Sequence, residues 1–251
     1  MLIDIHNHIL PGIDDGPTTE LDAILLLQNA VNNGITHIIA TPHHQNGVFT
    51  QNAQEVKRSI QILNDLMEEK EIPVVILPGM EVHLHGEIMD ELYTNILTLA
   101  DSGKYVLIEF PTHQIPNFTE SIFYELQLKG YIPVIAHAEK NYEFRRDPKK
   151  LFDLINKGAL IQLTAGSITG ANGRKLQKFS LKLCHYKMVH FIASDSHDVK
   201  HRPFLLKQAY NIIRRKIGKQ MVTYLQQNAK HVLEGEEFQP FTPTIIKKLN
   251  F

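Results

Sequence analysis

The sequence of 251 residues has one cysteine, no tryptophan and no long apolar run. Its single cysteine, Cys184, cannot form an internal disulfide, which is typical of proteins in a reducing compartment such as the cytoplasm. No apolar stretch approaches the roughly 20 residues that a membrane-spanning helix needs. The first residues also lack the basic region that opens a secretory signal peptide. We therefore expect a cytoplasmic protein without an inserted membrane segment.

The sequence also lacks an excess of charge of either sign. It has 26 Lys and Arg against 27 Asp and Glu, a formal net charge of −1, so electrostatics give no reason to expect nucleic acid or an anionic membrane as the main partner. Hydrophobic residues make up 43% and charged residues 21%, which is typical of a folded globular chain. We expect a soluble enzyme domain.

Several catalytic motifs are missing as well. A cysteine phosphatase has an arginine six residues after its nucleophilic cysteine, but His190 stands at that distance from Cys184. The sequence has no G-x-S-x-G elbow and no Walker-type phosphate loop. The Gly-rich stretch 166–170 follows an apolar run and is expected to be a βα loop. Chemistry in this chain must therefore depend on His, Asp and Glu.

Apolar runs and helical patterns alternate along the chain. Seven short runs are expected to be strands, at 2–5, 37–40, 73–77, 105–108, 132–136, 159–163 and 190–193. Helical patterns cover 19–33, 53–69, 120–129, 148–156, 174–186 and 203–216, with a weaker one at 87–99 and a last one at 219–231. Strand–helix units in series favour a parallel α/β barrel. We expect one domain over 1–251, with an extended tail at 236–251.

Ligand-type side chains stand where the predicted strands end. They are His6, His8, His43, Glu81, Glu109, His137, Asp195 and His197, with Asp15 in the loop after the first strand. Only the sixth strand lacks such a residue and offers Gln162 and Thr164 instead. The carboxyl ends of barrel strands share one face, and residues two apart on a strand point the same way. We therefore expect these side chains to converge at one mouth of the barrel.

Each histidine taken alone has a simpler interpretation, because an isolated His is more often part of a hydrogen-bonded structure than a ligand. We interpret seven in that way: His37, His83, His85, His113, His185, His190 and His231. Coincidence does not explain ligands at six of seven strand ends. Nine imidazoles and carboxylates exceed the needs of one tetrahedral zinc and suit two or three divalent ions. Ligands without thiolate allow Mn²⁺, Fe²⁺ or Zn²⁺.

Clustered divalent ions indicate hydrolysis, because they activate water and hold the oxygens of an in-line displacement at phosphorus. Two cations could help to neutralise a phosphate group. Lys140 and Arg202 lie in the loops expected after the fifth and seventh strands. We interpret Arg145 and Arg146, which are close by, as a solvated charge run. The residues thus predict a metallohydrolase that acts on a phosphoester.

These motifs resemble a known superfamily. His6-x-His8, Asp15-Gly16, Thr41-Pro42-His43, Glu81, Glu109, His137 and Ser194-Asp195-x-His197 resemble the polymerase-and-histidinol-phosphatase (PHP) superfamily. Within it, residues 4–16 and 189–197 are similar to the bacterial tyrosine-protein phosphatases of capsule and exopolysaccharide operons. The resemblance covers the chain to about Gly235.

The resemblance implies a distorted, seven-stranded, TIM-like (β/α) barrel with three metal ions, usually manganese. It implies one ion on His6, His8, Glu81 and Asp195, a second on Glu81, Glu109 and His137, and a third on Asp15, His43 and His197. Asp15 is chosen over Asp14 because the ligand of the family directly precedes the glycine, which leaves Asp14 to support the loop. Arg202 matches one of the two phosphate-binding arginines of the family. Lys140 replaces the other, which keeps the charge but loses the two-pronged guanidinium.

The resemblance further implies hydrolysis of phosphotyrosine monoesters. The implied substrate is the Tyr-rich C-terminal tail of a bacterial tyrosine kinase that controls polysaccharide synthesis or export. A small-molecule phosphatase, such as a histidinol-phosphate phosphatase, shares the same metal site and would need a deep, closed pocket. A non-catalytic metal-binding or kinase-docking protein is the third hypothesis.

Overall fold

A ring of parallel strands forms the centre of the protein. The structure, a computed structural model, describes residues 1–246. Its strands are β1 (Ile3–Asn7), β2 (His37–Ala40), β3 (His43–His44), β4 (Val75–Pro78), β5 (Glu81–His83), β6 (Tyr105–Glu109), β7 (Ile132–Ile135), β8 (Leu160–Thr164) and β9 (Phe191–Ala193). The strand orders are β1-β2-β4 and β3-β5-β6-β7-β8-β9, and each pairing is parallel.

Two of the seven predicted strands are interrupted. The chain of β2 passes through Pro42 into β3, and that of β4 passes through Gly79 into β5. Pro42 has no N–H to donate to a sheet ladder. Gly79 packs so closely that a Cβ there would lie 2.8 Å from Cγ2 of Ile39. With each interrupted strand counted once, the ring has seven strands in chain order, which confirms the predicted distorted barrel.

The first and last strands close this ring. A bridge joins Asn7 to Ser196, and the N–H groups of His8 and Asp195 donate to the carbonyls of Ser196 and His6, both at 2.9 Å. Beneath them, the buried carboxylate of Asp4 accepts hydrogen bonds from the N–H and the hydroxyl of Ser194. The closure therefore places the ligands of the first strand beside those of the last.

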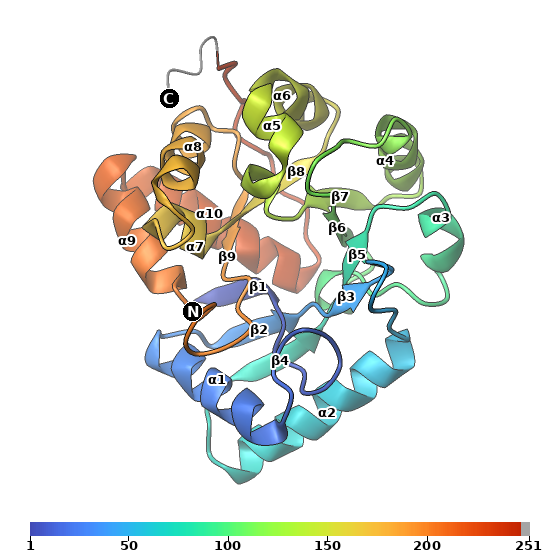
Figure 1. Cartoon of the computed structure of the whole chain (residues 1–251), viewed down its shortest axis with the longest axis vertical. Coiled ribbons are helices and arrows are strands. Elements are labelled where there is room, and N and C mark those ends of the chain that lie inside the picture. The colour runs from blue at the N-terminus through green and yellow to red at the C-terminus, as the bar shows by residue number, and fades with distance from the viewer. Residues whose placement is uncertain (247–251) are drawn as a thin grey trace.

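Helices surround the ring, as Figure 1 shows. They are α1 (Glu20–Asn32), α2 (Ala53–Glu69), α3 (Ile88–Glu91), α4 (Thr119–Leu128), α5 (Tyr142–Arg146), α6 (Pro148–Asn156), α7 (Ala165–Thr169), α8 (Arg174–His185), α9 (Leu206–Lys216) and α10 (Lys219–Glu234), with 3₁₀ turns at Leu99–Asp101 and Ala138–Lys140. The Thr19 side chain caps α1 by accepting from the N–H of Asp22, as an N-cap residue should. None of the helices among residues 1–246 is long and apolar enough to cross a membrane.

Three details of the predicted elements are wrong. Instead of a helix over 87–99, the chain forms only the four residues of α3, because the side chain of Asn95 accepts from the N–H of Ala53 and fixes the following turn. The stretch 166–170 is not a loop, since α7 covers most of it and ends at Gly170 with a φ of 90°. The helix predicted over 203–216 begins only at Leu206.

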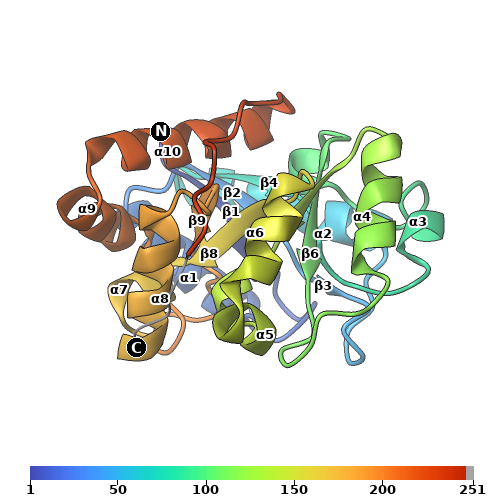
Figure 2. The same ribbon diagram turned by 90° about the horizontal axis from the view of Figure 1, so that it is seen from above.

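The hydrophobic core has two layers. The barrel interior holds Ile5, Tyr105, Leu107 and Phe191 with neighbouring apolar side chains, and Val232 of α10 packs against this interior cluster. The second layer lies between the strands and the surrounding helices. Figure 2 shows α10 lying across one end of the barrel. This end is the floor, because the strands begin there, and the carboxyl ends of the strands form the opposite mouth.

The C-terminal tail contacts this floor side. The hydroxyl of Tyr105 donates to the carbonyl of Glu236, and the ring of Phe241 stacks on Tyr224 with 3.9 Å between centroids. Residues 236–246 contain neither helix nor strand. The last part of the predicted extended tail, 247–251, lies outside the described residues. The described part of the tail therefore packs on the barrel rather than over the mouth.

Candidate metal centre

All nine predicted ligands lie at the mouth of the barrel, where their side chains form overlapping groups. We call His6, His8 and Glu81 the inner group; His8, Asp15, His43 and His197 the outer group; and His43, Glu81 and Glu109 the middle group. Within each group the potential ligand atoms lie within 4.8 Å of one another. The two remaining predicted ligands, His137 and Asp195, border these groups.

Glu81 is the centre of the inner group. Its Oε2 atom lies 3.2 Å from Nε2 of both His6 and His8, and its side chain is completely buried. The same carboxylate reaches two further imidazoles, Nδ1 of His43 at 3.1 Å and Nε2 of His137 at 2.7 Å. One carboxylate thus contacts four histidines from three strands, which is the position of a bridging ligand.

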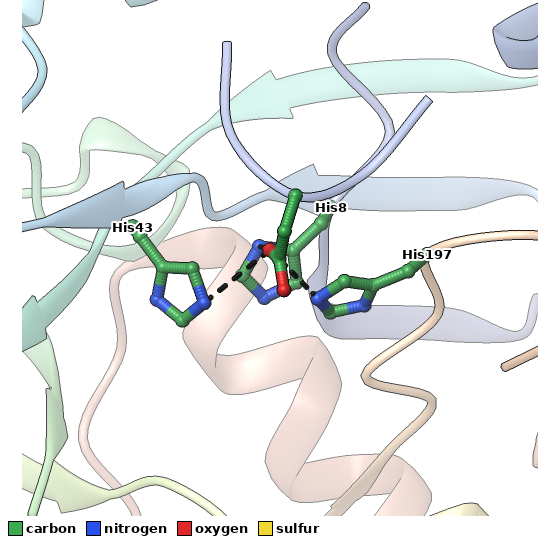
Figure 3. A group of neighbouring side chains, drawn as sticks. His8, His43 and His197 are labelled. Atoms are coloured by element: carbon green, nitrogen blue, oxygen red, sulfur yellow. Dashed lines mark ion pairs between the residues drawn. The ribbon is translucent and has the colours of Figure 1, made fainter. Parts of the chain in front are cut away.

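The outer group is organised around Asp15. Its Oδ1 atom lies 3.1 Å from Nε2 of His197 and 3.5 Å from Nε2 of His43. Figure 3 shows these two histidines and His8 directed towards one carboxylate. The Asp15 side chain is 45% exposed, whereas the side chains of the inner group are fully buried. The outer group therefore opens to solvent.

Two predicted ligands, His137 and Asp195, lie beside the groups and close to the ligands with which the resemblance pairs them. Nε2 of His137 bonds to Glu81 and lies 3.8 Å from Glu109, while His43 completes the middle group. Oδ1 of Asp195 lies 3.8 Å and 3.7 Å from the Nε2 atoms of His6 and His8. It is also 2.7 Å from the guanidinium of Arg202. Asp195 thus connects the ligands to the cations of the mouth.

Two polar residues hold the ligands in position. Asp14 accepts from Nδ1 of His8 at 2.6 Å and from the N–H of His43 at 3.1 Å. It therefore orients the His8 ring and holds the backbone at His43. The Gln162 side-chain oxygen accepts from Nδ1 of His6 at 3.0 Å and from the N–H of His137 at 2.9 Å. Gln162 was noticeable as a polar residue within an apolar strand, but no motif assigned it this role.

The buried charges fix the protonation of several groups. Burial opposes the protonation of His8, but Asp14 and Glu81 outweigh it and raise the pKa of His8 to about 10. Burial, with the positive charge of His8, lowers the pKa of His197 to about 4. Glu81 is also buried, yet His6 and His137 hold its pKa well below the usual value. His197 is therefore neutral at pH 7 and Glu81 is charged, which are the forms that bind metal.

The residues fit a metal centre by a further criterion. Among residues 1–246, the buried atoms Oε2 of Glu81, Nδ1 of His43 and Nε2 of His197 have no hydrogen-bond partner of good geometry. Buried polar atoms without a partner are rare because they lose the solvation that water would supply. All three point into the groups described above, where a divalent cation would coordinate them. Oxygen and nitrogen donors without thiolate suit such ions.

A cavity of about 270 Å³ opens beside the groups. Asp15, His43, Glu81, Glu109, Phe110, Thr112, Ile135, Ala136, His137, Ala138, Lys140, Asn141, Asp195 and Arg202 line it. The ammonium of Lys140 bonds to Asp195, opposite Arg202. Both predicted phosphate contacts therefore face the cavity that also holds the metal-ligand candidates.

Of the residues that we set apart from the predicted site, Arg145 differs from its interpretation, whereas His83 and His190 are hydrogen-bonded as expected. Arg145 is not a solvated charge, because its guanidinium donates to the carbonyls of Glu139 and Lys140 and so braces that loop. His83 lies at the edge of the middle group, with Nδ1 3.4 Å from Glu109. His190 is buried away from the mouth, and its Nδ1 accepts from the N–H of Ile161.

The fold and the mouth together define a class of protein, the (β/α)-barrel proteins with a carboxylate-bridged cluster of metal-ligating side chains. The chain belongs to the capsular polysaccharide synthesis CpsB/CapC family, whose model matches residues 2–234. The family predicted from the sequence motifs is thereby confirmed.

Similar proteins agree with this assignment. The chain is 42% identical over 250 residues to the tyrosine-protein phosphatase YwqE of Bacillus subtilis, covering 99% of this chain and 98% of that protein. It is 39% identical to the putative tyrosine-protein phosphatase CapC of Staphylococcus aureus, covering 97% and 95%. A crystal structure from work on YwqE and on CpsB of Streptococcus pneumoniae, described as unique metal-dependent tyrosine phosphatases, superposes with a TM-score of 0.96 at 42% identity. The match covers 98% of this chain and all of that one.

Proposed function

We propose that this chain is a metal-dependent protein-tyrosine phosphatase. The observation that carries the proposal is the convergence of nine imidazole and carboxylate ligands with two cations, Lys140 and Arg202, at one cavity of the barrel mouth. The related proteins YwqE, CapC and CpsB carry the same activity in their names. The matches to YwqE and CapC cover 99% and 97% of this chain.

The ligand groups suit three divalent ions, for which we propose manganese. His6, His8, Glu81 and Asp195 would hold one ion; Glu81, Glu109 and His137 a second; and Asp15, His43 and His197 the third. When bound, such ions lower the pKa of water and neutralise phosphoryl oxygens. The central place of Glu81 and the orphaned buried atoms of three of these residues support this assignment.

The cations of the mouth would complete the phosphate site. Arg202 and Lys140 flank Asp195 from two different loops, so a phosphate group in the cavity would meet both. Charge-assisted hydrogen bonds of this kind stabilise the charge that develops on phosphoryl oxygens. Phe110 and Thr112 line the same cavity and would contact the aryl ring of the substrate.

We further propose a biological substrate, phosphotyrosine in the C-terminal tail of a cytoplasmic bacterial tyrosine kinase that regulates polysaccharide synthesis. The capsule-synthesis family of the chain supports this choice. The described C-terminal residues pack at the floor, so a substrate segment could approach the mouth without displacing them.

Phosphate release tests this function directly. A tyrosine-phosphorylated peptide and histidinol phosphate are compared as substrates, with Mn²⁺ and with a chelator. We expect the peptide to be preferred and turnover to stop on chelation. The variants His6→Ala and Asp195→Ala should lose turnover while circular dichroism shows an intact fold. Preference for histidinol phosphate would contradict the proposal, as would turnover that survives chelation.

A further inference from the structure

Charge is divided unevenly along this chain. Residues 1–100 contain 14 Asp and Glu but only 3 Lys and Arg, whereas residues 101–251 contain 13 acidic and 23 basic residues. The two parts also occupy different sides of the barrel. In Figure 1, α1 and α2 lie below the ring of strands, and α5, α6, α8 and α9 lie above it or to its left. The mouth draws ligands from both parts, so it lies between an acidic side and a basic side.

A second cavity adjoins the first on the basic side. It measures about 180 Å³ and shares Lys140, Asp195 and Arg202 with the first cavity, the one that opens beside the ligand groups. Its other lining residues come from the loops after β8 and β9 and from the start of α8: Thr164, Gly166, Ala171, Asn172, Leu176, Ser194, His201, Pro203 and Leu205. A side chain next to a phosphotyrosine in the first cavity would therefore meet this second one.

Two exposed cations stand next to lining residues of the second cavity in the sequence. Arg174 and Lys175 lie between the lining residues Asn172 and Leu176, and both are exposed. Neither forms an ion pair with any residue in the described part of the chain, and the same holds for Lys178 one turn later. His201 is exposed at the opposite rim.

The nearby carboxylates are already engaged. Asp195 is buried between Lys140 and Arg202. Asp198 accepts from the N–H groups of Lys200 and His201, which keeps its side chain in the loop. The second cavity thus has Lys140 and Arg202 in its lining, two exposed cations on the adjoining start of α8, and apolar side chains from Leu176, Pro203 and Leu205.

We propose that the second cavity is a specificity subsite for an acidic side chain, Asp or Glu, close to the phosphotyrosine of the substrate. This inference rests on the proposed function. The apolar wall suits the aliphatic stem of Glu, and Arg174, Lys175 and His201 complement its carboxylate. The cavity has about two-thirds of the volume of the first, which favours an aliphatic carboxylate over a second phosphotyrosine ring.

Two matched peptides test the subsite on the metal-loaded enzyme. Both carry one phosphotyrosine, flanked on either side by Glu in one peptide and by Gln in the other. We expect KM to be about fivefold lower for the Glu peptide, with kcat unchanged, as two partly exposed ion pairs would give. The difference should shrink in high salt, which screens exposed charges. Equal KM values for the two peptides would overturn the subsite.

Charge variants locate the effect. R174Q/K175Q removes two exposed cations beside the cavity and should bring the KM ratio of the two peptides close to one, with kcat retained. R214Q/R215Q makes the same change in net charge at the far end of α9, where both side chains are exposed, and should leave the ratio unchanged. A loss of preference in the control variant would mean that only net charge matters, and would overturn the assignment.

Four outcomes separate the alternatives. A preference for a second phosphotyrosine but not for Glu would overturn the choice of a carboxylate. Binding to phosphatidylserine vesicles that R174Q/K175Q abolishes, without any peptide preference, would assign this surface to a membrane instead. If the enzyme hydrolyses both peptides with equal KM, the subsite proposal is wrong but the proposed phosphatase function stands. If it hydrolyses neither, the proposed function itself fails.

Discussion

The inner and outer ligand groups differ in how the fold holds them. The inner group stands on strand ends, is fully buried and has the Glu81 carboxylate at its centre. The outer group depends on Asp15, which lies in a loop and is 45% exposed. Asp14, the neighbour of Asp15, bonds to His8 and to the backbone of His43 and so stabilises that loop. Side chains brace both groups, since Asp14 also bonds to His8 and Gln162 to His6, so the groups differ in burial and in whether a strand or a loop carries the central carboxylate.

This difference predicts unequal retention of metal. Buried ligands with fixed rotamers lose little freedom when an ion binds, and solvent has little access to them. We expect ions of the inner group to stay bound under dilution or brief dialysis, and the ion of the outer group to exchange.

The largest effect should come from Glu81→Gln. Because Glu81 contacts His6, His8, His43 and His137, its loss removes the shared negative charge of the centre. We expect phosphatase kcat to fall by roughly a thousandfold or more and the bound metal to fall by more than one ion per chain. Steady-state kinetics and elemental analysis measure both. Near-normal metal content in this variant would contradict the central role of Glu81.

Asp15→Asn should have a smaller and partly reversible effect. The change weakens only the outer group, so kcat should fall by about 10- to 100-fold and recover in part when Mn²⁺ is raised. The inner ions should remain. If Asp15→Asn lost as much metal as Glu81→Gln, the two groups would form a single cooperative unit and the comparison would fail.

His190 provides a reference for the ligand histidines, because it is equally buried and no carboxylate raises its pKa. Burial alone lowers its pKa to about 3, whereas Asp14 and Glu81 raise the pKa of the equally buried His8 to about 10. Between about pH 6.5 and 3 the unfolded chain binds a proton at His190 that the folded chain excludes, so stability is full above this window and falls as pH decreases.

The free energy of unfolding should reveal this effect. Because of His190 it should decrease by about 1 kcal/mol per pH unit below pH 6. Urea unfolding of the wild type and of His190→Asn, both in chelator, measures the contribution as the difference between their pH slopes. Parallel slopes would show that His190 takes up its proton without unfolding.

The smallest effect concerns Lys140, which belongs to neither group. Lys140→Arg would place a planar guanidinium at this position, which can donate two parallel hydrogen bonds to a phosphate group. We expect KM for a phosphotyrosine peptide to fall by about two- to fivefold, with the metal content unchanged. An increase in KM would show that the cavity fits the compact ammonium better than the larger guanidinium. Lys140→Gln is the matched control and should raise KM.

Sequence patterns predicted the ring of strands, because apolar β-branched runs are visible in the local sequence. The parallel arrangement of such strands follows from general rules for alternating strands and helices. The sequence patterns also placed all nine ligand candidates at one mouth. They did not predict the breaks at Pro42 and Gly79, because a break depends on close packing against a neighbouring strand. The failure of the 87–99 helix has a similar cause, a hydrogen bond that the Asn95 side chain accepts from the N–H of Ala53, 42 positions away.

The partition of ligands among groups was harder to predict than their identity. Which imidazole lies nearest to which carboxylate depends on side-chain rotamers: Glu109 lies 3.7 Å from Nδ1 of His43 and 3.8 Å from Nε2 of His137. The resemblance left Asp14 to support its loop, but the contacts of Asp14 with His43 and of Gln162 with His6, which span 29 and 156 positions, were not predicted. Composition and spacing carry no record of such contacts.

The closure of the ring also sets the order in which the site can form during synthesis. Asp4 and Ser194 bond across 190 positions, and His6 and His8 meet Asp195 and His197 only at that seam. A chain growing on the ribosome carries its first two ligands long before the last two exist, and contacts of such long range form late in folding. A prematurely terminated chain that ends before β9 lacks both the seam and two of the nine ligands. Such a fragment would have no assembled centre, so only a chain that has been translated past residue 197 can become an active enzyme.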